Sequence, residues 1–457
     1  MDKLKLGNVT LICLSDVKIP QSIKAIEICK AFADFGAVKF LTSKPNDYEH
    51  TVQIDTPIYS INKYSEFMIE RLADYVDTDY CLVVQWDGFI LNPEAWTDEF
   101  MQYDFVGAPY GQHPLHLGNG GFSLRSKKLL DELQTLSYFN FHKGVPEDKV
   151  ICQLLRPALE NVGCKFPDLE TAEKFSSEGL WNGEFGFHDL NLNRVADRLR
   201  SVFTDYHKGQ PMTGMHSGDL GDIIYCIPTI RALGITRLAL NPTRSQGTNF
   251  GRKNYEAIIP LLEAQGIEVV EYTDEVHVDY YLDSFRKCLI DLNSQHLALS
   301  QAKAMQATVD LSEPFIAFPK YDKVYDIVVN KTERYSGGMN YETILNPFKH
   351  TGCKMAFIGH KDEYYKFAQS FNCFDVEYIE TETLLDAARV IASAKVFVGN
   401  QSSLFAIAEG LKVNRVLEVC AYANNCMPQS DNGFAWVSGY HDGLTIKFIK
   451  RYLRDEN

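Results

Sequence analysis

Short apolar runs alternate with helix-like segments in the N-terminal part of the chain. Val9–Ser15 and Val38–Leu41 are expected to be strands. Between them, Pro20 suits the first turn of a helix because its missing N–H has no helical partner there, and Gly36 is expected to end that helix. Tyr80–Val84 is continuously apolar, which predicts a central parallel strand buried on both faces. This alternation predicts an α/β sheet.

Further elements continue the same rhythm up to a polar break. Helices are expected over Tyr64–Val76, near Glu94–Met101 and over Arg194–Phe203, and a strand is expected over Phe105–Ala108. The segment Asp205–Gly214 is polar and contains two glycines and a proline, so it is the best linker in the chain.

The α/β rhythm restarts beyond this linker. A short strand at Met212–His216, a helix at Ile223–Leu233 and a strand at Arg237–Leu240 are expected, followed by a break near Pro314–Lys323. A last block contains the expected strands Asp326–Asn330, Met355–Ile358 and Val396–Val398. We therefore expect three domains, covering residues 1–208, 209–320 and 321–457.

Length, charge and cysteine usage narrow the class of protein. The 457 residues suffice for two or three domains. A formal net charge of -15 argues against stable nucleic-acid binding, which needs clustered cations. The eleven cysteines form no Cys-x-x-Cys pair, so reduced thiols are expected.

The location of the protein is expected to be cytoplasmic. No apolar stretch reaches the roughly 18 residues of a membrane span, so no transmembrane segment is expected. The basic and aromatic tail Lys447–Arg454 is expected to be a solvated terminal helix, and peripheral contact with the inner face of the membrane stays open.

A first group of chemically able residues follows the apolar strand at Tyr80–Val84. Ligands of open α/β sheets bind beyond the carboxyl ends of strands, and Asp87 lies there. Its carboxylate can hold Mg²⁺ or Mn²⁺ against a nucleotide diphosphate, and His188 can add a second ligand. We expect the two side chains to lie within about 5 Å of each other. Taken alone, an aspartate at a strand end such as Asp87 is more often a helix cap or turn former, and a lone histidine such as His188 is more often a structural residue.

A glycine turn and an acidic pair complete this first group. Asn119, Gly120 and Gly121 form a tight turn that allows the backbone to approach a sugar closely. Asp148 or Glu147 can act as general base on an acceptor hydroxyl. The acidic pair after Pro146 is also a good helix N-terminus, because acids there suit the helix dipole.

These motifs resemble a glycosyltransferase-like family of bacterial and phage genomes, similar in layout to GT-A transferases. The resemblance covers about residues 1–200 and is carried by Val84–Phe89, Asp104–Tyr110, Gly118–Ser126, Pro146–Asp148 and Phe185–His188. It implies Asp87 and His188 as metal ligands, Asp148 as base and the glycine motif with Arg125 as donor contacts. GT-A enzymes carry an Asp-x-Asp motif, whereas Gln85 stands here in place of the first acid.

A second group lies in the loop after the expected strand Met212–His216. The loop Gly218-Asp219-Leu220-Gly221-Asp222 lets the backbone turn tightly and places Asp222 near a helix N-terminus. It is neither a Rossmann fingerprint nor a P-loop. An anionic loop is a poor phosphate cradle but a reasonable base for an acceptor hydroxyl, and simple helix capping remains open for both acids.

A third group opens the helix that follows the expected strand Val396–Val398. Free N–H groups and the Ser402 and Ser403 hydroxyls suit a diphosphate, and Arg334 can bring a cation to the same anion. N-capping is the alternative role of the serines. The residues expected to contact the donor in this part of the chain are Gly399, Asn400, Gln401, Ser402, Ser403 and Glu409.

The second and third groups together resemble the heptosyltransferase type of GT-B enzyme. The resemblance covers about residues 212–440 and is carried by Gly218–Leu233 and Val398–Glu409, with Phe405 where that family has histidine. It implies an acceptor half followed by a donor half, with Asp222 as base. The loop residues Gly218, Asp219 and Gly221 are expected to contact substrate.

The fold class expected from both resemblances is α/β, a GT-A-like domain followed by a compact GT-B-like pair of Rossmann-type domains. The function expected is a bifunctional glycosyltransferase of hexosyl or heptosyl type, acting in polysaccharide biosynthesis. Its donors are nucleotide-sugars, a UDP-sugar being favoured for the N-terminal domain, and its acceptor is a glycan. Mn²⁺ or Mg²⁺ is expected in the N-terminal domain, with no NAD and no PLP.

Two other functions remain as alternatives. One active transferase domain fused to a binding module that has lost catalysis is consistent with the departures at Gln85 and Phe405. A sugar-nucleotide epimerase would need bound NAD, and the missing fingerprint argues against it.

Overall fold

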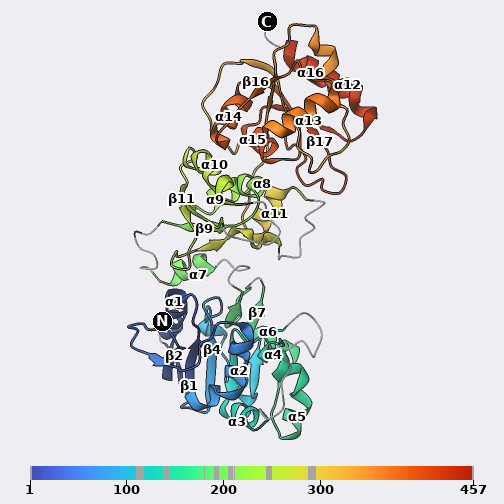
Figure 1. Cartoon of the computed structure of the whole chain (residues 1–457). Coiled ribbons are helices and arrows are strands. Elements are labelled where there is room, and N and C mark those ends of the chain that lie inside the picture. Colours follow the sequence, from blue (N-terminus) through green and yellow to red (C-terminus); the bar gives the residue numbers. More distant parts are fainter. Residues whose placement is uncertain are drawn as a thin grey trace. The chain divides into compact units, whose positions relative to one another are not determined.

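The computed structural model describes residues 3–109, 118–136, 144–179, 181–189, 195–203, 209, 211–242, 250–286 and 295–454. The chain divides into two compact units, Met1–Lys208 and Gly209–Asn457, called unit 1 and unit 2 below (Figure 1). Tyr110, Arg194 and half of the expected linker, residues 205–208 and 210, lie outside the described residues.

Unit 1 is built on a six-stranded sheet in the order β3-β2-β1-β4-β6-β5. Its strands are β1 (Leu4–Leu14), β2 (Ala33–Thr42), β3 (Thr51–Gln53), β4 (Tyr80–Val84), β5 (Phe105–Gly107) and β6 (Ser123–Ser126). The strand β4 pairs parallel with β1 but antiparallel with β6. The expectation of a strand in a parallel environment was therefore wrong on one side, because β6 runs back along β4 and pairs antiparallel with both β4 and β5.

Helices cover both faces of this sheet. Leu11 and Cys13 of β1 pack in one core with α1 (Ile19–Phe32). Ile12 and Leu14 point to the other face, into a core shared with α2 (Ile61–Glu70) and α3 (Lys127–Leu136). Burial of alternate residues on opposite faces explains why Leu11–Leu14 of β1 and the whole of β4 are continuously apolar.

Gly36 does not end a helix. The helix α1 stops at Phe32, and Gly36 lies inside β2. A Cβ atom at Gly36 would lie 2.2 Å from the backbone oxygen of Gly7. Glycine is needed there because β1 and β2 approach closely, which the sequence alone does not distinguish from a helix stop.

Two other expected helices of unit 1 are shorter than predicted. The segment Tyr64–Val76 covers the end of α2 and a separate 3₁₀ turn, η1 (Leu72–Tyr75). The segment Glu94–Met101 overlaps two 3₁₀ turns, η2 (Pro93–Ala95) and η3 (Asp98–Gln102). The Thr97 side chain accepts a hydrogen bond from the Glu99 N–H, so the chain restarts there instead of continuing one helix.

The last part of unit 1 carries several short elements. They are α4 (Glu147–Lys149), the π turn η5 (Val150–Leu154), α5 (Arg156–Asn161), α6 (Leu169–Phe175), β7 (Ser176–Glu178), β8 (Gly186–His188) and α7 (Val195–Val202). The strands β7 and β8 form a parallel pair that sets Glu178 beside His188.

Unit 2 contains two sheets in which all strand pairs are parallel. The first has the order β11-β10-β9-β12, with β9 (Thr213–His216), β10 (Arg237–Leu240), β11 (Glu268–Glu271) and β12 (Tyr280–Tyr281). The second has the order β15-β14-β13-β16-β17-β18, with β13 (Tyr325–Asn330), β14 (Met355–Ile358), β15 (Glu377–Ile379), β16 (Ala394–Asn400), β17 (Asn414–Glu418) and β18 (Gly433–Trp436).

The second sheet has the strand order of a doubly wound nucleotide-binding fold. In chain order within this half, its strands run 3-2-1-4-5-6, and the order reverses between β13 and β16. The first sheet reverses in the same way between β9 and β12. Ligands of such sheets bind at the carboxyl ends of the strands that flank the reversal, so both reversals of unit 2 mark candidate ligand sites.

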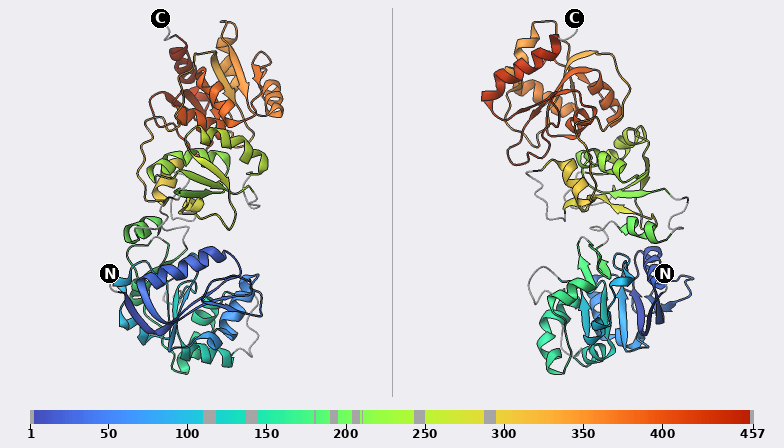
Figure 2. Two further views of the ribbon diagram at one scale, coloured as in Figure 1. Left: turned by 90° about the vertical axis from the view of Figure 1, so that its left-hand side faces the viewer. Right: turned by 180° about the vertical axis from the view of Figure 1, so that it is seen from behind.

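The helices of unit 2 pack on these sheets (Figure 2). They are α8 (Leu220–Tyr225), α9 (Ile227–Ala232), α10 (Arg252–Glu263), η7 (Leu282–Arg286), α11 (Leu297–Ala304), α12 (Tyr341–Lys349), α13 (Lys361–Phe371), α14 (Leu384–Ala392), α15 (Ser403–Leu411), η8 (Gly439–His441) and α16 (Asp442–Arg454). The expected single helix Ile223–Leu233 is divided into α8 and α9 at Cys226, because Pro228 offers no N–H to continue the helix.

None of the helices in the described part of the chain combines the length and the apolar character that crossing a membrane requires.

Candidate functional sites

The turn after β4 presents Asp87. Gln85 and Gly88 exchange backbone hydrogen bonds of 2.9 and 3.1 Å, which closes the turn with Asp87 at its tip. Asp87 Oδ1 lies 3.8 Å from His188 Nε2, so the structure brings the two expected metal ligands together. Asp87 Oδ1 is buried and has no hydrogen-bond partner among the described residues. A buried carboxylate oxygen of this kind calls for a cation.

The opposite edge of the His188 ring is held by an acid that the sequence did not reveal. Glu178 Oε2 lies 3.0 Å from His188 Nδ1 and also accepts a 2.6 Å hydrogen bond from Asn119 Nδ2. Burial lowers the pKa of His188, but the hydrogen bond to Glu178 and the charges of Asp87, Glu178 and Asp189 outweigh it and raise the pKa to about 9. Glu178 lies in a short polar strand without apolar alternation, so no periodic signal marked it.

The glycine turn at Asn119 makes room for protein side chains. A Cβ atom at Gly121 would lie 2.1 Å from the His188 ring, and one at Gly120 would lie 2.4 Å from Glu147 Oε1. The close approach that the glycines allow is therefore to His188 and Glu147, where the sequence analysis expected a sugar. The glycines thus leave room for His188 and Glu147 on either side of one turn.

Arg125 and the acidic pair form a buried cluster. Arg125 Nη2 makes a 3.0 Å ion pair with Glu147, and both side chains are buried. Burial raises the pKa of Glu147 above its usual range although the charge of Arg125 opposes the shift. Asp148 accepts hydrogen bonds from the N–H groups of Gly120, at 3.0 Å, and Lys149, at 2.7 Å. Arg125 thus holds Glu147, and Asp148 supports the glycine turn.

The residues around Asp87 fit a divalent ion held partly by the protein. Within the described ranges, no group of three or more His, Cys, Asp and Glu residues is arranged to hold a metal. Asp87 and His188 would supply two ligands, and the Gln85 Oε1 atom lies 3.3 Å from His188 Nε2. Mg²⁺ is commonly bound by one or two protein side chains together with substrate phosphates. Glu178 fixes the imidazole from behind, as carboxylates do for histidine ligands.

Unit 2 contains a cleft of about 730 Å³ that both of its sheets supply with residues. Seven of the expected site residues line it, namely Asp219, Gly221, Asp222, Arg334, Gln401, Ser402 and Ser403. The two motifs that supply six of them are far apart in the chain and meet here at the two reversals of strand order. Gly218, Gly399, Asn400 and Glu409 do not line the cleft.

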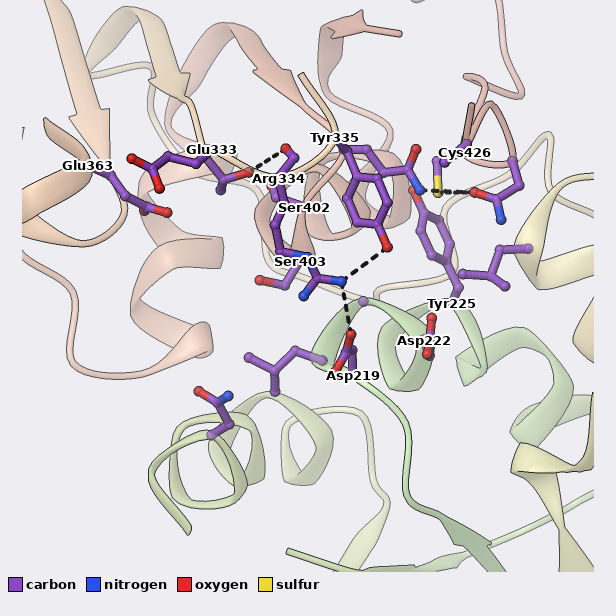
Figure 3. Close-up of a pocket in the computed structure, with 18 of the residues that line it drawn as sticks. Asp219, Asp222, Tyr225, Glu333, Arg334, Tyr335, Glu363, Ser402, Ser403 and Cys426 are labelled. Atoms are coloured by element: carbon purple, nitrogen blue, oxygen red, sulfur yellow. Dashed lines mark hydrogen bonds and ion pairs between the residues drawn. The ribbon is translucent and has the colours of Figure 1, made fainter. Parts of the chain in front are cut away.

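The charged side chains of this cleft are paired with one another. Arg334 from the second half makes a 3.3 Å ion pair with Asp219 from the first half and donates a 3.1 Å hydrogen bond to the Tyr335 hydroxyl (Figure 3). Asp222 is paired with Arg286, which the sequence analysis missed. Arg286 is the last residue of η7, which directly follows β12. Because β12 pairs with β9, a prediction of that pairing would have indicated that Arg286 lies near the loop after β9.

The N-terminus of α15 is capped as its sequence allows. Ser402 Oγ accepts a 3.2 Å hydrogen bond from the Phe405 N–H and donates a 2.8 Å hydrogen bond to Asn330. Asn400 donates a 2.6 Å hydrogen bond to the backbone oxygen of Arg334. Asn400 is therefore buried support for the loop that carries Arg334, and the capping role of Ser402 is realised.

Glu409 is placed away from the cleft, in the core of the second half. It is fully buried and bonded to Arg415 at 2.5 Å and to Lys412. Burial opposes ionisation, but the charges of Arg415 and Lys412 hold its pKa below the usual range. The expected donor contact at this position does not fit, because the carboxylate lies beyond the first turns of α15.

Comparison with known families places one match inside unit 1. A family described as "Protein of unknown function (DUF5672)" matches residues 49–192. Curated proteins give no match to the chain.

Solved structures similar to this chain include three bacterial transferases. The E. coli heptosyltransferase WaaC with ADP-2-deoxy-2-fluoro heptose is 12% identical, over 52% of this chain and 99% of its own, with a TM-score of 0.32. The iron-containing dodecameric glycosyltransferase TibC from enterotoxigenic E. coli H10407 is 15% identical, over 53% and 77%, with a TM-score of 0.34. A family 9 glycosyl transferase from Veillonella parvula is 10% identical, over 52% and 88%, with a TM-score of 0.33. At these values the likeness assigns no activity or substrate to the chain.

Proposed function

We propose that unit 2 transfers a sugar from a nucleotide-sugar donor to a hydroxyl of a glycan acceptor. The observation that carries the proposal is the meeting of two motifs and Arg334 in one cleft at the carboxyl ends of parallel strands. The cleft offers a carboxylate, a guanidinium and a helix N-terminus. These are the groups that acid–base chemistry on a hydroxyl and neutralisation of a diphosphate require.

In this reaction, Asp222 takes the proton from the acceptor hydroxyl. The acceptor oxygen then bonds to the anomeric carbon of the donor sugar, and the bond from that carbon to the diphosphate breaks. Negative charge grows on the departing diphosphate. Arg334 and the N–H groups of the first turn of α15 would stabilise it without a metal.

Asp219 has a specific part in donor binding. Because Arg334 is ion-paired with Asp219, a diphosphate must compete with this carboxylate for the guanidinium. Asp219 is the N-cap residue of α8, yet its side chain makes no capping hydrogen bond. It is thus available to release Arg334 without unravelling a helix end.

We further propose that unit 1 is a second, metal-assisted transferase centre that prefers a UDP-sugar. The buried Oδ1 of Asp87 near His188 supports it. A bound Mg²⁺ or Mn²⁺ would stabilise charge on the departing diphosphate. Asp87 and His188 would hold it, and Asp148 would serve as base. The second candidate function for unit 1 is binding of a carbohydrate or nucleotide without catalysis. Gln85, which stands in place of an acid, favours this alternative.

A donor screen with the full-length protein tests both proposals. Release of UDP, GDP, ADP or CMP from the corresponding nucleotide-sugars would be measured with and without EDTA. We expect one activity that survives EDTA and is lost in Asp222→Asn, and one that needs the metal and is lost in Asp87→Asn. Absence of any metal-independent release or donor binding would overturn the proposal for unit 2. Loss of the metal-dependent activity alone would reduce unit 1 to a binding module.

A further inference from the structure

The cleft of unit 2 has a charged part and a neutral part. The charged part contains the ion pairs of Arg334 and Asp222 described above. The neutral part, called the neutral patch below, consists of Tyr225, Gln401, Asn425 and Cys426. Gln401 donates a 3.0 Å hydrogen bond to Asn425, and both amides open onto the cleft. The neutral patch therefore offers hydrogen-bonding groups without net charge.

Tyr225 carries a buried hydroxyl that the protein leaves unsatisfied. Tyr225 is 2% exposed, and its hydroxyl has no hydrogen-bond partner among the described residues. The ring rises from α8 toward Cys426 (Figure 3). Burial and the neighbouring Cys426 thiol raise the pKa of Tyr225, but a thiol is only a weak hydrogen-bonding group and leaves the hydroxyl poorly satisfied. Leaving a buried hydroxyl without a partner costs roughly 1–3 kcal/mol, so this group calls for a partner that enters the cleft.

His296 fixes the ring of Tyr225 and stays neutral. The two rings lie 5.1 Å apart, edge to face. His296 Nδ1 accepts a hydrogen bond from the Ala298 N–H at the start of α11, so the proton of the neutral ring lies on Nε2. Burial lowers the pKa of His296 to about 4. The wall behind Tyr225 is therefore uncharged at neutral pH.

The neutral patch begins one residue from the turn proposed to bind phosphate. Gln401 precedes Ser402, the N-cap of α15, and both line the cleft with Arg334. A group bonded to a diphosphate at this turn lies in the same cleft as the neutral patch. A sugar ring has that chemistry, because its hydroxyls are uncharged donors and acceptors.

We propose that the neutral patch binds the sugar of the nucleotide-sugar donor and that the Tyr225 hydroxyl is a specificity-determining hydrogen-bonding group for a sugar hydroxyl. This inference rests on the function proposed for unit 2 and deepens it. It assigns binding of the diphosphate to Arg334 and the N-terminus of α15, and recognition of the sugar to the neutral patch. A charged sugar, such as a uronic acid, finds no counter-ion in the neutral patch and is disfavoured.

The test compares binding of a nucleotide-sugar with binding of its nucleoside diphosphate. Calorimetry on the full-length Tyr225→Phe variant would use the donor that the screen selects and the matching diphosphate. We expect affinity for the nucleotide-sugar to fall about 3- to 10-fold, the scale of one neutral hydrogen bond. Affinity for the diphosphate should stay unchanged, because the lost hydroxyl touches only the sugar.

Thr229→Val is the matched control. Thr229 also carries a buried hydroxyl without a hydrogen-bond partner among the described residues, but it lies in α9 and does not line the cleft. This variant should bind both ligands like the parent protein. Both variants should keep or raise the melting temperature, because each removes a buried unsatisfied hydroxyl.

The outcomes separate this inference from the proposed function. Equal loss of affinity for both ligands in Tyr225→Phe would overturn the sugar assignment, and so would no loss for either. A fall in melting temperature in Tyr225→Phe alone would show that the hydroxyl serves the fold. Failure of the parent protein to bind any diphosphate would instead overturn the function proposed for unit 2.

Discussion

The two candidate sites use the same residue types with opposite electrostatic results. In unit 1, His188 lies between Glu178 and Asp87, and its pKa is raised to about 9. In unit 2, His296 is enclosed by packing, and burial lowers its pKa to about 4. The acids around His188 thus favour its protonated form, and a bound metal ion would displace that proton, whereas burial keeps His296 neutral beside Tyr225.

This contrast indicates which ligands the sites suit. Unit 1 offers carboxylates, one of them with an unsatisfied buried oxygen, which favours a cation. Unit 2 offers Arg334 and the N-terminus of α15, which favour an anion. A chain with two sugar-transfer centres would therefore stabilise the same departing diphosphate in two ways, through an ion in unit 1 and through protein groups in unit 2.

Replacing the two proposed bases should give the largest effects. Asp222→Asn should lower the metal-independent transfer by about 10²–10⁴-fold, because a general base contributes that much, and it should leave the metal-dependent transfer intact. Asp148→Asn should do the converse. Initial rates of diphosphate release, with and without EDTA, measure both.

A single variant that abolished both activities in a folded protein would contradict two independent centres. The Asp148 substitution also removes a partner of the Gly120 N–H, so its folding must be checked. Unchanged circular dichroism and melting temperature are the control.

Much of the fold could be predicted from the sequence, because continuous apolar runs mark the buried strands of α/β proteins clearly. The strands Arg237–Leu240 and Met355–Ile358 are confirmed as β10 and β14 to the residue. The errors fell where tertiary packing decides. Gly36 was predicted to end a helix, but it is a strand residue at a point of close packing. The apolar pattern predicted one helix across Pro228, but the proline divides it.

The candidate sites were only partly predictable for a related reason. Motif residues such as Asp87, His188, Asp222 and Ser402 are marked by their place at strand ends. Their partners Glu178 and Arg286 come from separate segments, and no local pattern ties them to the motifs. Glu409 belongs to a motif by sequence, but its carboxylate is consumed by a buried ion pair.

Acid should destabilise unit 2 through His296. Its folded pKa of about 4 lies below the usual 6.5, because burial and the charges of Lys412 and Arg415 outweigh the attraction of Glu409. The unfolded chain therefore binds the proton more readily between these values. The stability from neutral His296 is complete above pH 6.5 and is lost as pH falls toward 4, by roughly 3 kcal/mol in total.

The variant His296→Asn isolates this effect, because asparagine keeps an acceptor for the Ala298 N–H. Urea unfolding of both proteins at pH 7, 5.5 and 4.5 measures the difference in unfolding free energy. The difference in unfolding free energy between variant and parent should become smaller as the pH falls. A difference that stays constant would show that His296 is protonated as easily in the folded protein as in the unfolded chain.

Removing the Arg334 guanidinium should weaken the binding of the donor by unit 2, and this binding should not depend on a metal. Arg334→Ala should lower diphosphate affinity by about 1.5–3 kcal/mol, the scale of a hydrogen bond to a charged group. Calorimetry in EDTA measures it. Arg389→Ala is the control, because Arg389 is as exposed as Arg334, at 50% against 51%, and pairs with Asp386 within one helix. An EDTA-sensitive affinity, or equal affinities of the two variants, would remove the contrast between the sites.

The smallest effect should come from the acid behind His188. Glu178→Gln keeps the shape of the side chain but removes the charge that orients the imidazole and raises its pKa. Loss of such a supporting carboxylate typically costs about 10–100-fold in metal affinity. Mn²⁺ titration monitored by electron paramagnetic resonance measures that affinity, and NMR titration of the metal-free protein should show the His188 pKa moving down. Glu173→Gln, at an exposed position of α6, should change neither quantity. If Glu178→Gln lowered the histidine pKa but bound Mn²⁺ as the parent does, His188 would serve the charge balance of unit 1 and not the metal.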